Sequence, residues 1–196
     1  VDGKVSLKTI DDRVLDVLKV KFKEKLFDNP YKGNEELSEK TVHSKANQAV
    51  SMKAALESMI LLKNDKNILP LNKDIRKIAV IGPNADEAKN LICRYGPANA
   101  PVKTVYQGIK SYLPNADVLY AKGCDIIDKH FPESELYDVP LDSAEQQMIN
   151  EAVEQARKSD VAILVLGGNE KTVREEYSRS SLNLCGRQEQ LLKAVF

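Results

Sequence analysis

Apolar and polar positions along the chain alternate in blocks that predict strands and helices in turn. Short apolar runs closed by turn residues predict strands at residues 77–81, 117–121 and 161–166. The last run is six consecutive apolar residues, which favours a strand buried on both faces of a parallel sheet. Helix-compatible stretches separate the runs, so the pattern predicts βαβ units with right-handed crossovers. We therefore expect an α/β fold, a mostly parallel sheet with helices on both faces.

The first third of the chain predicts helices alone. One begins after Thr9, the expected N-cap, and a second, longer helix is predicted over residues 38–63. His43 lies near the start of the second helix, and a lone histidine without a Ser, Cys or metal partner favours a structural role. Further along the chain, Ser143 and Gln146 have the spacing of a capping box and predict the start of the helix before the third strand.

The composition of the chain argues against several classes of function. The 29 basic and 29 acidic residues cancel, so the chain offers no net field for nucleic acid or an anionic membrane surface. No apolar stretch reaches the roughly 20 residues of a membrane span. The three cysteines lack CxxC spacing and there are only two histidines, so we expect no structural zinc site.

The segment that follows the third predicted strand is the best candidate for chemistry. Residues 169–179 are mostly charged and cannot belong to a core, so they predict an exposed loop. Within it, Glu175 and Glu176 lie between Arg174 and Arg179. In open α/β sheets, ligands bind at the edge formed by the carboxyl ends of the strands. Adjacent carboxylates at that edge point to a functional site.

Two other motifs favour weaker interpretations. Residues 82–86 follow a strand as a phosphate loop would, but they match neither common glycine-rich pattern, and Pro83 lacks a backbone donor. Nucleotide binding through this turn is the weakest of the functions considered. The acidic side chains of residues 115–140 match no standard metal-binding loop, so we interpret them as a solvated acidic insertion. We expect no cofactor and no bound metal.

Several linked segments resemble glycoside hydrolase family three, the exo-acting β-glucosidases and β-xylosidases. Residues 57–86, ESMILLKNDKNILPLNKDIRKIAVIGPNAD, resemble the entry into that family's second domain. Residues 14–31, VLDVLKVKFKEKLFDNPY, are similar to the closing helix and exit of its first domain. The resemblance continues through YGPANAPVKTVYQGIK, AKGCDI and residues 159–195, so it covers nearly the whole chain in the family's order.

The resemblance implies a domain organisation. Residues 1–33 would be the C-terminal tail of a TIM-like barrel domain, residues 34–45 a linker, and residues 46–196 an α/β sandwich domain truncated at its C-terminal end. The chain would then be a fragment of a longer enzyme that is secreted or periplasmic by family analogy. The missing barrel domain would be its partner in forming the site.

The resemblance also assigns a catalytic residue. The family uses a retaining mechanism, with an aspartate nucleophile on the barrel and an acid/base glutamate in the second domain. Its pattern E-x-x-[DS]-R, followed by a leucine and by L-P-G-x-Q, places the acid/base role on Glu175. The other positions that match are Ser178, Arg179, Leu182, Leu184, Gly186 and Gln188. Cys185 stands where the family has proline, and we interpret it as structural or incidental.

The implied function is part of a retaining exo-acting β-glycosidase, a β-glucosidase or β-xylosidase of carbohydrate catabolism, acting on an oligosaccharide or glycoside. The residues that bind the sugar mostly belong to the barrel, and because the nucleophile also lies there, we expect this chain alone to be inactive. The main alternative is a non-catalytic α/β binding or interaction module in which residues 170–179 are only a solvated loop. An upstream barrel with a strand ending in an aspartate would distinguish the two.

Overall fold

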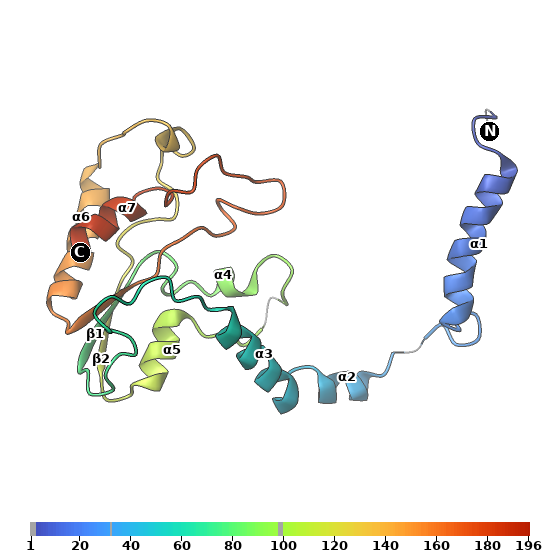
Figure 1. The fold of residues 1–196 in the computed structure, drawn as a ribbon, viewed down its shortest axis with the longest axis horizontal. Coiled ribbons are helices and arrows are strands. Elements are labelled where there is room, and N and C mark those ends of the chain that lie inside the picture. Colours follow the sequence, from blue (N-terminus) through green and yellow to red (C-terminus); the bar gives the residue numbers. More distant parts are fainter. Residues whose placement is uncertain (1–2, 32, 98–99) are drawn as a thin grey trace. The chain divides into compact units, whose positions relative to one another are not determined.

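The computed structural model describes residues 3–31, 33–97 and 100–196 (Figure 1). Ala98 and Asn99, which belong to one segment of the family resemblance, lie outside the described residues. Contacts divide the chain into two compact units, Val1–Asp65 and Lys66–Phe196. The assignment of residues 1–33 to a barrel tail and 34–45 to a linker stays a prediction. Within the described ranges, none of the helices combines the length and apolarity that crossing a membrane would need.

The first unit consists of helices, and their ends differ from those predicted. They are α1 (Leu7–Lys23), α2 (Glu35–Thr41) and α3 (Lys45–Ser58). The N-cap of α1 is Ser6, whose side chain accepts the N–H of Thr9, rather than Thr9 itself. The single helix predicted over residues 38–63 is wrong, because His43 has a left-handed φ of 57° and breaks it in two. Ser44 then caps α3 by accepting the N–H of Asn47.

The second unit is built on a three-stranded parallel sheet in the order β2-β1-β3. Its strands are β1 (Lys77–Ile81), β2 (Asp117–Ala121) and β3 (Val161–Leu164). The central strand β1 pairs in parallel with both neighbours, so that Ile78 lies opposite Val118 on one side and Val161 on the other. The α/β fold with a parallel sheet is therefore confirmed, and the carboxyl ends of β1 and β3 lie at the same edge.

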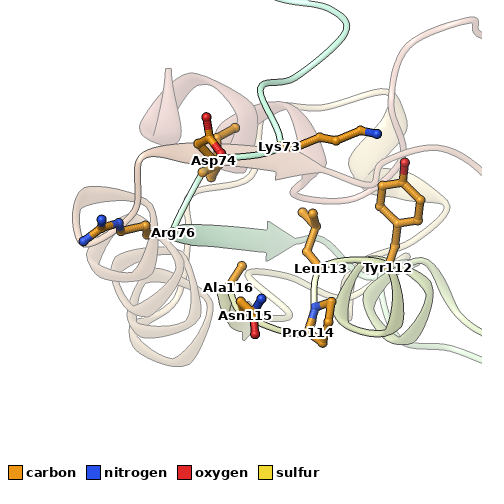
Figure 2. A pocket seen from close by; sticks show the side chains of 9 residues that line it. Lys73, Asp74, Arg76, Tyr112, Leu113, Pro114, Asn115 and Ala116 are labelled. Carbon is orange, nitrogen blue, oxygen red and sulfur yellow. The ribbon is translucent and has the colours of Figure 1, made fainter.

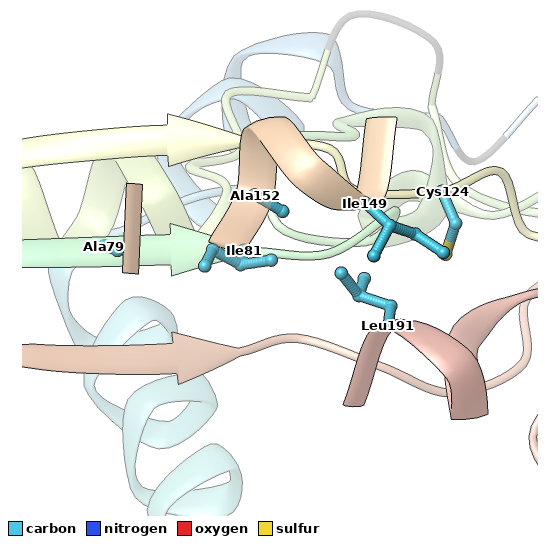
Figure 3. Close-up of a cluster of buried hydrophobic side chains, with 6 residues drawn as sticks. All are labelled: Ala79, Ile81, Cys124, Ile149, Ala152 and Leu191. Carbon is cyan, nitrogen blue, oxygen red and sulfur yellow. The ribbon is translucent and has the colours of Figure 1, made fainter. Parts of the chain in front are cut away.

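Helices cover both faces of this sheet, as predicted. The helices of the unit are α4 (Lys89–Ile92), α5 (Val105–Tyr112), α6 (Ser143–Arg157) and α7 (Gln188–Val195), with a 3-10 turn, η1, at Glu133–Glu135. Alternate residues of β1 point to opposite faces. Ile78 and Val80 pack against α5, whereas Ile81 packs with Ile149 of α6 and Leu191 of α7 (Figure 3). Both faces thus have an apolar core, and the rigid sheet can position the loops at its edge.

The helix starts of this unit are tied to neighbouring segments. Thr104 caps α5 in a capping box with Gln107, and its hydroxyl donates to Asp86 in the loop after β1 at 2.6 Å. The capping box of α6 uses Asp142 and Glu145, one residue before the predicted pair. These contacts fix the connections between strands and helices, and with them the loops that leave the sheet.

Candidate active site at the carboxyl edge of the sheet

Glu175 lies at the tip of the long loop between β3 and α7. Arg174 and Tyr177 exchange two backbone hydrogen bonds, of 3.1 and 2.9 Å, and close a two-residue turn. Glu175 and Glu176 are its central residues, and both are exposed. Glu176 has a φ of 71°, in the left-handed region. The backbone is therefore a tight turn at this point and not the extended strand in which neighbouring side chains point to opposite sides.

Glu175 is hydrogen-bonded to a residue from a different loop. The hydroxyl of Tyr95, which follows α4, donates to Oε2 of Glu175. Beside this contact, the backbone N–H of Arg94 donates to Glu170 Oε1 at 2.9 Å. The loops after β1 and β3 are thus connected at two points. The loop that the sequence placed at this edge therefore meets a second loop there, and the contact includes Tyr95, which the charge pattern of the loop gave no reason to expect.

The two arginines that flank the glutamate pair bind elsewhere. The guanidinium of Arg174 lies over the ring of Tyr177, 4.0 Å from its centroid, in a cation–π contact. Arg179 donates to Glu135 through Nε and Nη2, at 3.0 and 2.6 Å, and to the carbonyl of Asn183 through Nη1 at 2.7 Å. Among the described residues, neither arginine forms an ion pair with Glu175. The arginines therefore shape the loop and do not neutralise the charge of Glu175 by direct pairing.

The acidic segment over residues 115–140 is solvated only in part, because Asp125, Glu133 and Asp138 are exposed while two other carboxylates are not. The Arg179–Glu135 pair is mostly buried, with 13% and 12% of the two side chains exposed. Asp128 is also buried, and its carboxylate accepts from the N–H of His130 and the hydroxyl of Ser134, both at 2.7 Å. Within the described part of the chain, no cluster of His, Cys, Asp and Glu side chains is placed to hold a metal ion. Through Glu135, the buried part of the segment supports the base of the loop.

The start and end of the loop are tied together by a buried side chain. Gln188, at the start of α7, is fully buried. Its Oε1 accepts the N–H of Gly167 at 2.8 Å, and its Nε2 donates to the carbonyls of Gly167 and Cys185 at 3.2 and 3.1 Å. Asn84, after β1, also donates to the carbonyl of Gly167 at 3.2 Å and accepts from Asn169 at 3.4 Å. The loop therefore leaves and rejoins the sheet at a fixed position.

Two glycines in this region are required by close backbone approach. A Cβ on Gly82 would lie 2.3 Å from the carbonyl oxygen of Val165, and one on Gly186 would lie 2.9 Å from that of Ile126. Both also have positive φ values, of 131° and 57°. Gly82 thus allows the turn after β1 to pack on β3, which accounts for it without a phosphate ligand.

The two buried cysteines are poor candidates for chemistry. Burial raises the pKa of the Cys124 thiol to about 12, and burial also raises the pKa of Cys185. The thiolate is the reactive form, so both side chains are weak nucleophiles near neutral pH. Cys124 packs in the core shown in Figure 3, and Cys185 lies at the end of the loop beside Gln188.

A hollow in the second unit lies at the opposite edge of the sheet. It has a volume of about 700 Å³ and is formed by the residues that precede β1 and β2 (Figure 2). Lys73, Asp74 and Arg76 line one side, and Tyr112 and Leu113 line the other. This hollow is at the amino ends of the strands, so it is separated from Glu175 by the length of the sheet.

Comparison with known proteins identifies what the whole chain is similar to. Residues 59–196 match the family described as glycosyl hydrolase family 3 C-terminal domain. Curated relatives include the probable β-D-xylosidase 7 of Arabidopsis thaliana, 33% identical over 98% of this chain and 23% of its own length. The periplasmic β-glucosidase of Salmonella typhimurium is 35% identical over 98% of this chain and 27% of its own length. The chain thus spans about a quarter of each relative.

Solved structures give the same result. A β-glucosidase involved in saponin metabolism, from intestinal bacteria, superimposes with a TM-score of 0.82 and 30% sequence identity. The match covers 98% of this chain and 28% of that structure. A β-glucosidase from Bifidobacterium adolescentis superimposes with a TM-score of 0.63 and 27% identity over 99% of this chain and 25% of its own length. The sequence resemblance is therefore matched by a resemblance in fold.

Proposed function

Because the chain belongs to glycoside hydrolase family 3, we propose that it is part of a retaining, exo-acting β-glycosidase and supplies the loop that carries its acid/base residue, Glu175. The substrate would be a β-glucoside or a β-xyloside, since relatives of both names match the chain. The periplasmic relative supports a secreted or periplasmic enzyme. Residues 1–33 would close a barrel domain, residues 34–45 would link it, and residues 46–196 would belong to the α/β sandwich domain.

The proposal is supported by the different positions of the motif residues in the loop, some at its base and Glu175 at its tip. Three motif residues hold the loop in place. Arg179 forms a mostly buried ion pair, Gly186 allows a close backbone approach, and the buried amide of Gln188 binds the backbone of Gly167. Glu175 and Glu176 are both exposed at the tip of the loop, and Glu175 is the one at the glutamate position of the motif. A loop that three motif residues hold at its base, with the motif carboxylate exposed at its tip, is suited to presenting that carboxylate to a substrate.

The chemistry requires a proton donor of this kind. In the first step, Glu175 would donate its proton to the glycosidic oxygen while a carboxylate of the enzyme outside this chain attacks the anomeric carbon and the alcohol leaves. In the second step, Glu175 would take a proton from water as the water displaces the enzyme carboxylate. The two carboxyl groups of a retaining enzyme lie about 5 Å apart, so the barrel would bring its nucleophile to the tip of this loop.

Leaving-group dependence in the longer protein that contains this chain tests the proposal. Phenyl β-glycosides need protonation as the bond breaks, whereas dinitrophenyl β-glycosides do not. Glu175→Gln is expected to lower kcat/KM on the phenyl substrates by about 100-fold or more and to affect the first step on dinitrophenyl substrates far less. Equal losses on both substrates would contradict the assignment. A wild-type protein that binds glycosides without cleaving them would favour the non-catalytic module.

A further inference from the structure

The hydroxyl of Tyr95 contacts the one side chain on which the proposed chemistry depends. We propose that Tyr95 is a positioning residue for the acid/base group, which it holds by one carboxylate oxygen so that the other meets the leaving group. The contact is a hydrogen bond from Tyr95 Oη to Glu175 Oε2. Glu175 Oε1 has no hydrogen-bond partner in the part of the chain that the structure describes. The inference rests on the proposed function of Glu175.

The tyrosine is placed by its backbone and not by packing of its ring. Its side chain is 74% exposed, so little apolar contact fixes it. The neighbouring N–H of Arg94 donates to Glu170 Oε1 at 2.9 Å, which anchors the loop after α4 to the loop that carries Glu175. Because β1 and β3 are paired and their carboxyl ends lie together, the two loops start side by side. Tyr95 therefore approaches Glu175 from a segment 80 residues earlier in the chain.

The hydrogen bond acts differently on the two steps of the reaction. In the first step, the proton on Glu175 Oε1 moves to the glycosidic oxygen, the C–O bond breaks, and the carboxyl becomes a carboxylate. A hydroxyl that donates to Oε2 bonds a carboxylate more strongly than a neutral acid, so it favours this proton transfer. In the second step, Glu175 must accept a proton from water, and the same bond opposes that gain. Tyr95 thus assists the departure of poor leaving groups specifically.

Tyr95→Phe in the longer protein removes only the oxygen atom that makes the contact. It is expected to lower kcat/KM about threefold to tenfold on phenyl β-glycosides, the range for an exposed hydrogen bond to a charged group. On dinitrophenyl β-glycosides, for which the second step limits the rate, kcat is expected to stay within about twofold or to rise. Tyr112→Phe is the matched control. Tyr112 is an exposed tyrosine in α5 at the other edge of the sheet, so both substrates are expected to be unaffected by this change.

Repeating the Tyr95→Phe change in the Glu175→Gln variant separates this inference from the proposed function. In Glu175→Gln there is no acid to position, so adding Tyr95→Phe is expected to cause no further loss on phenyl substrates. A loss of the same size in both backgrounds, or an equal loss on phenyl and dinitrophenyl substrates, would show that Tyr95 acts through the general structure of the loop and would overturn the inference. If Glu175→Gln itself shows no leaving-group dependence, the proposed function fails and the inference fails with it. If only Tyr95→Phe lacks that dependence, the inference alone fails.

Discussion

Gln188 holds both backbone groups of Gly167 with the two ends of one side-chain amide. Its Oε1 accepts the Gly167 N–H at 2.8 Å and its Nε2 donates to the Gly167 carbonyl at 3.2 Å. Gly167 comes just after β3, and Gln188 is the first residue of α7. Gly167 and Gln188 are 21 residues apart in sequence, and their contact closes the base of the loop that carries Glu175.

Gln188→Leu keeps the size of the side chain and removes this contact. The Gly167 carbonyl would still accept from Asn84, but its half-buried N–H would lose the partner that Gln188 provides. An orphaned buried donor costs about 1–3 kcal/mol, and because this N–H is only half-buried we expect the free energy of local opening around Gly167 to fall by about 1 kcal/mol. Hydrogen exchange of peptides that cover residues 161–170 measures it. The exposed contact of Gln147 with Glu151 on α6 gives the control, Gln147→Leu, which should leave that exchange unchanged.

The ion pair of Arg179 with Glu135 gives a second prediction. Removing one partner of a fully buried pair costs about 3–5 kcal/mol, and the small exposure of this pair lowers our expectation to about 2–4 kcal/mol. Glu135→Gln should therefore speed hydrogen exchange over residues 178–186 and lower activity through a mobile loop. Glu133→Gln, an exposed change in the same 3-10 turn, is the control. Similar exchange in the two variants would mean that the pair does not support the loop.

The capping box of α6 gives the chain an acid-sensitive contact. The hydrogen bond from Lys129, followed by the backbone N–H of Glu145, lowers the pKa of Asp142 from 3.8 to about 2. A carboxylate whose pKa is lowered in the folded state stabilises the fold at any pH above its pKa in the unfolded chain. This contribution is lost as pH falls from about 4 to about 2. The difference in thermal midpoint between wild type and Asp142→Asn should therefore shrink over that interval. Lys129→Met should weaken the pH dependence, and a difference that stays constant down to pH 2 would contradict the prediction.

The left-handed backbone of Glu176 predicts which substitutions the turn accepts. Glycine adopts a φ of 71° without strain, whereas β-branched residues rarely do. Glu176→Gly should change stability by less than about 0.5 kcal/mol, because relief of strain and the added freedom of the unfolded chain offset each other. Glu176→Val should destabilise the turn by about 1–2 kcal/mol. Since Glu176 is not the assigned acid, the glycine variant should retain kcat/KM on phenyl glycosides within about twofold, and a larger loss would question the assignment.

The sheet could be predicted from sequence because its strands are short apolar runs with turn residues after them. Strand β2 matches its predicted range, and β3 ends two residues early, at Leu164. Helix starts were less certain. Ser143 with Gln146 and Asp142 with Glu145 both have capping-box spacing, so the local sequence does not choose between them. The structure uses Asp142 and Glu145, whose carboxylates also bind Lys129 and Arg187, residues that local patterns cannot bring together.

The candidate site was predictable in part for the same reason. An exposed charged loop after a buried strand pointed to Glu175, and the family resemblance gave its register. Its contacts were not predictable, because Tyr95 and Glu135 lie 80 and 44 residues away in the chain from the side chains that they bind. The acidic composition of residues 115–140 suggested a solvated segment. Pairing with Arg179 is what allows Glu135 to be mostly buried.

Glu175, and not Glu176, is the residue to which we assign the acid/base role. Removing that group stalls the second step, because water then lacks a general base, while a small anion needs none. The most direct test is azide rescue on a dinitrophenyl β-glycoside, using Glu175→Ala and Glu176→Ala in the longer protein that contains this chain.

Azide is expected to raise kcat of Glu175→Ala by about tenfold or more and to yield a β-glycosyl azide. Glu176→Ala should turn over at close to the wild-type rate without azide and gain nothing from it. Rescue of Glu176→Ala in place of Glu175→Ala would contradict the register of the assignment. Absence of rescue in both variants, with turnover retained, would show that the acid/base group lies outside this loop.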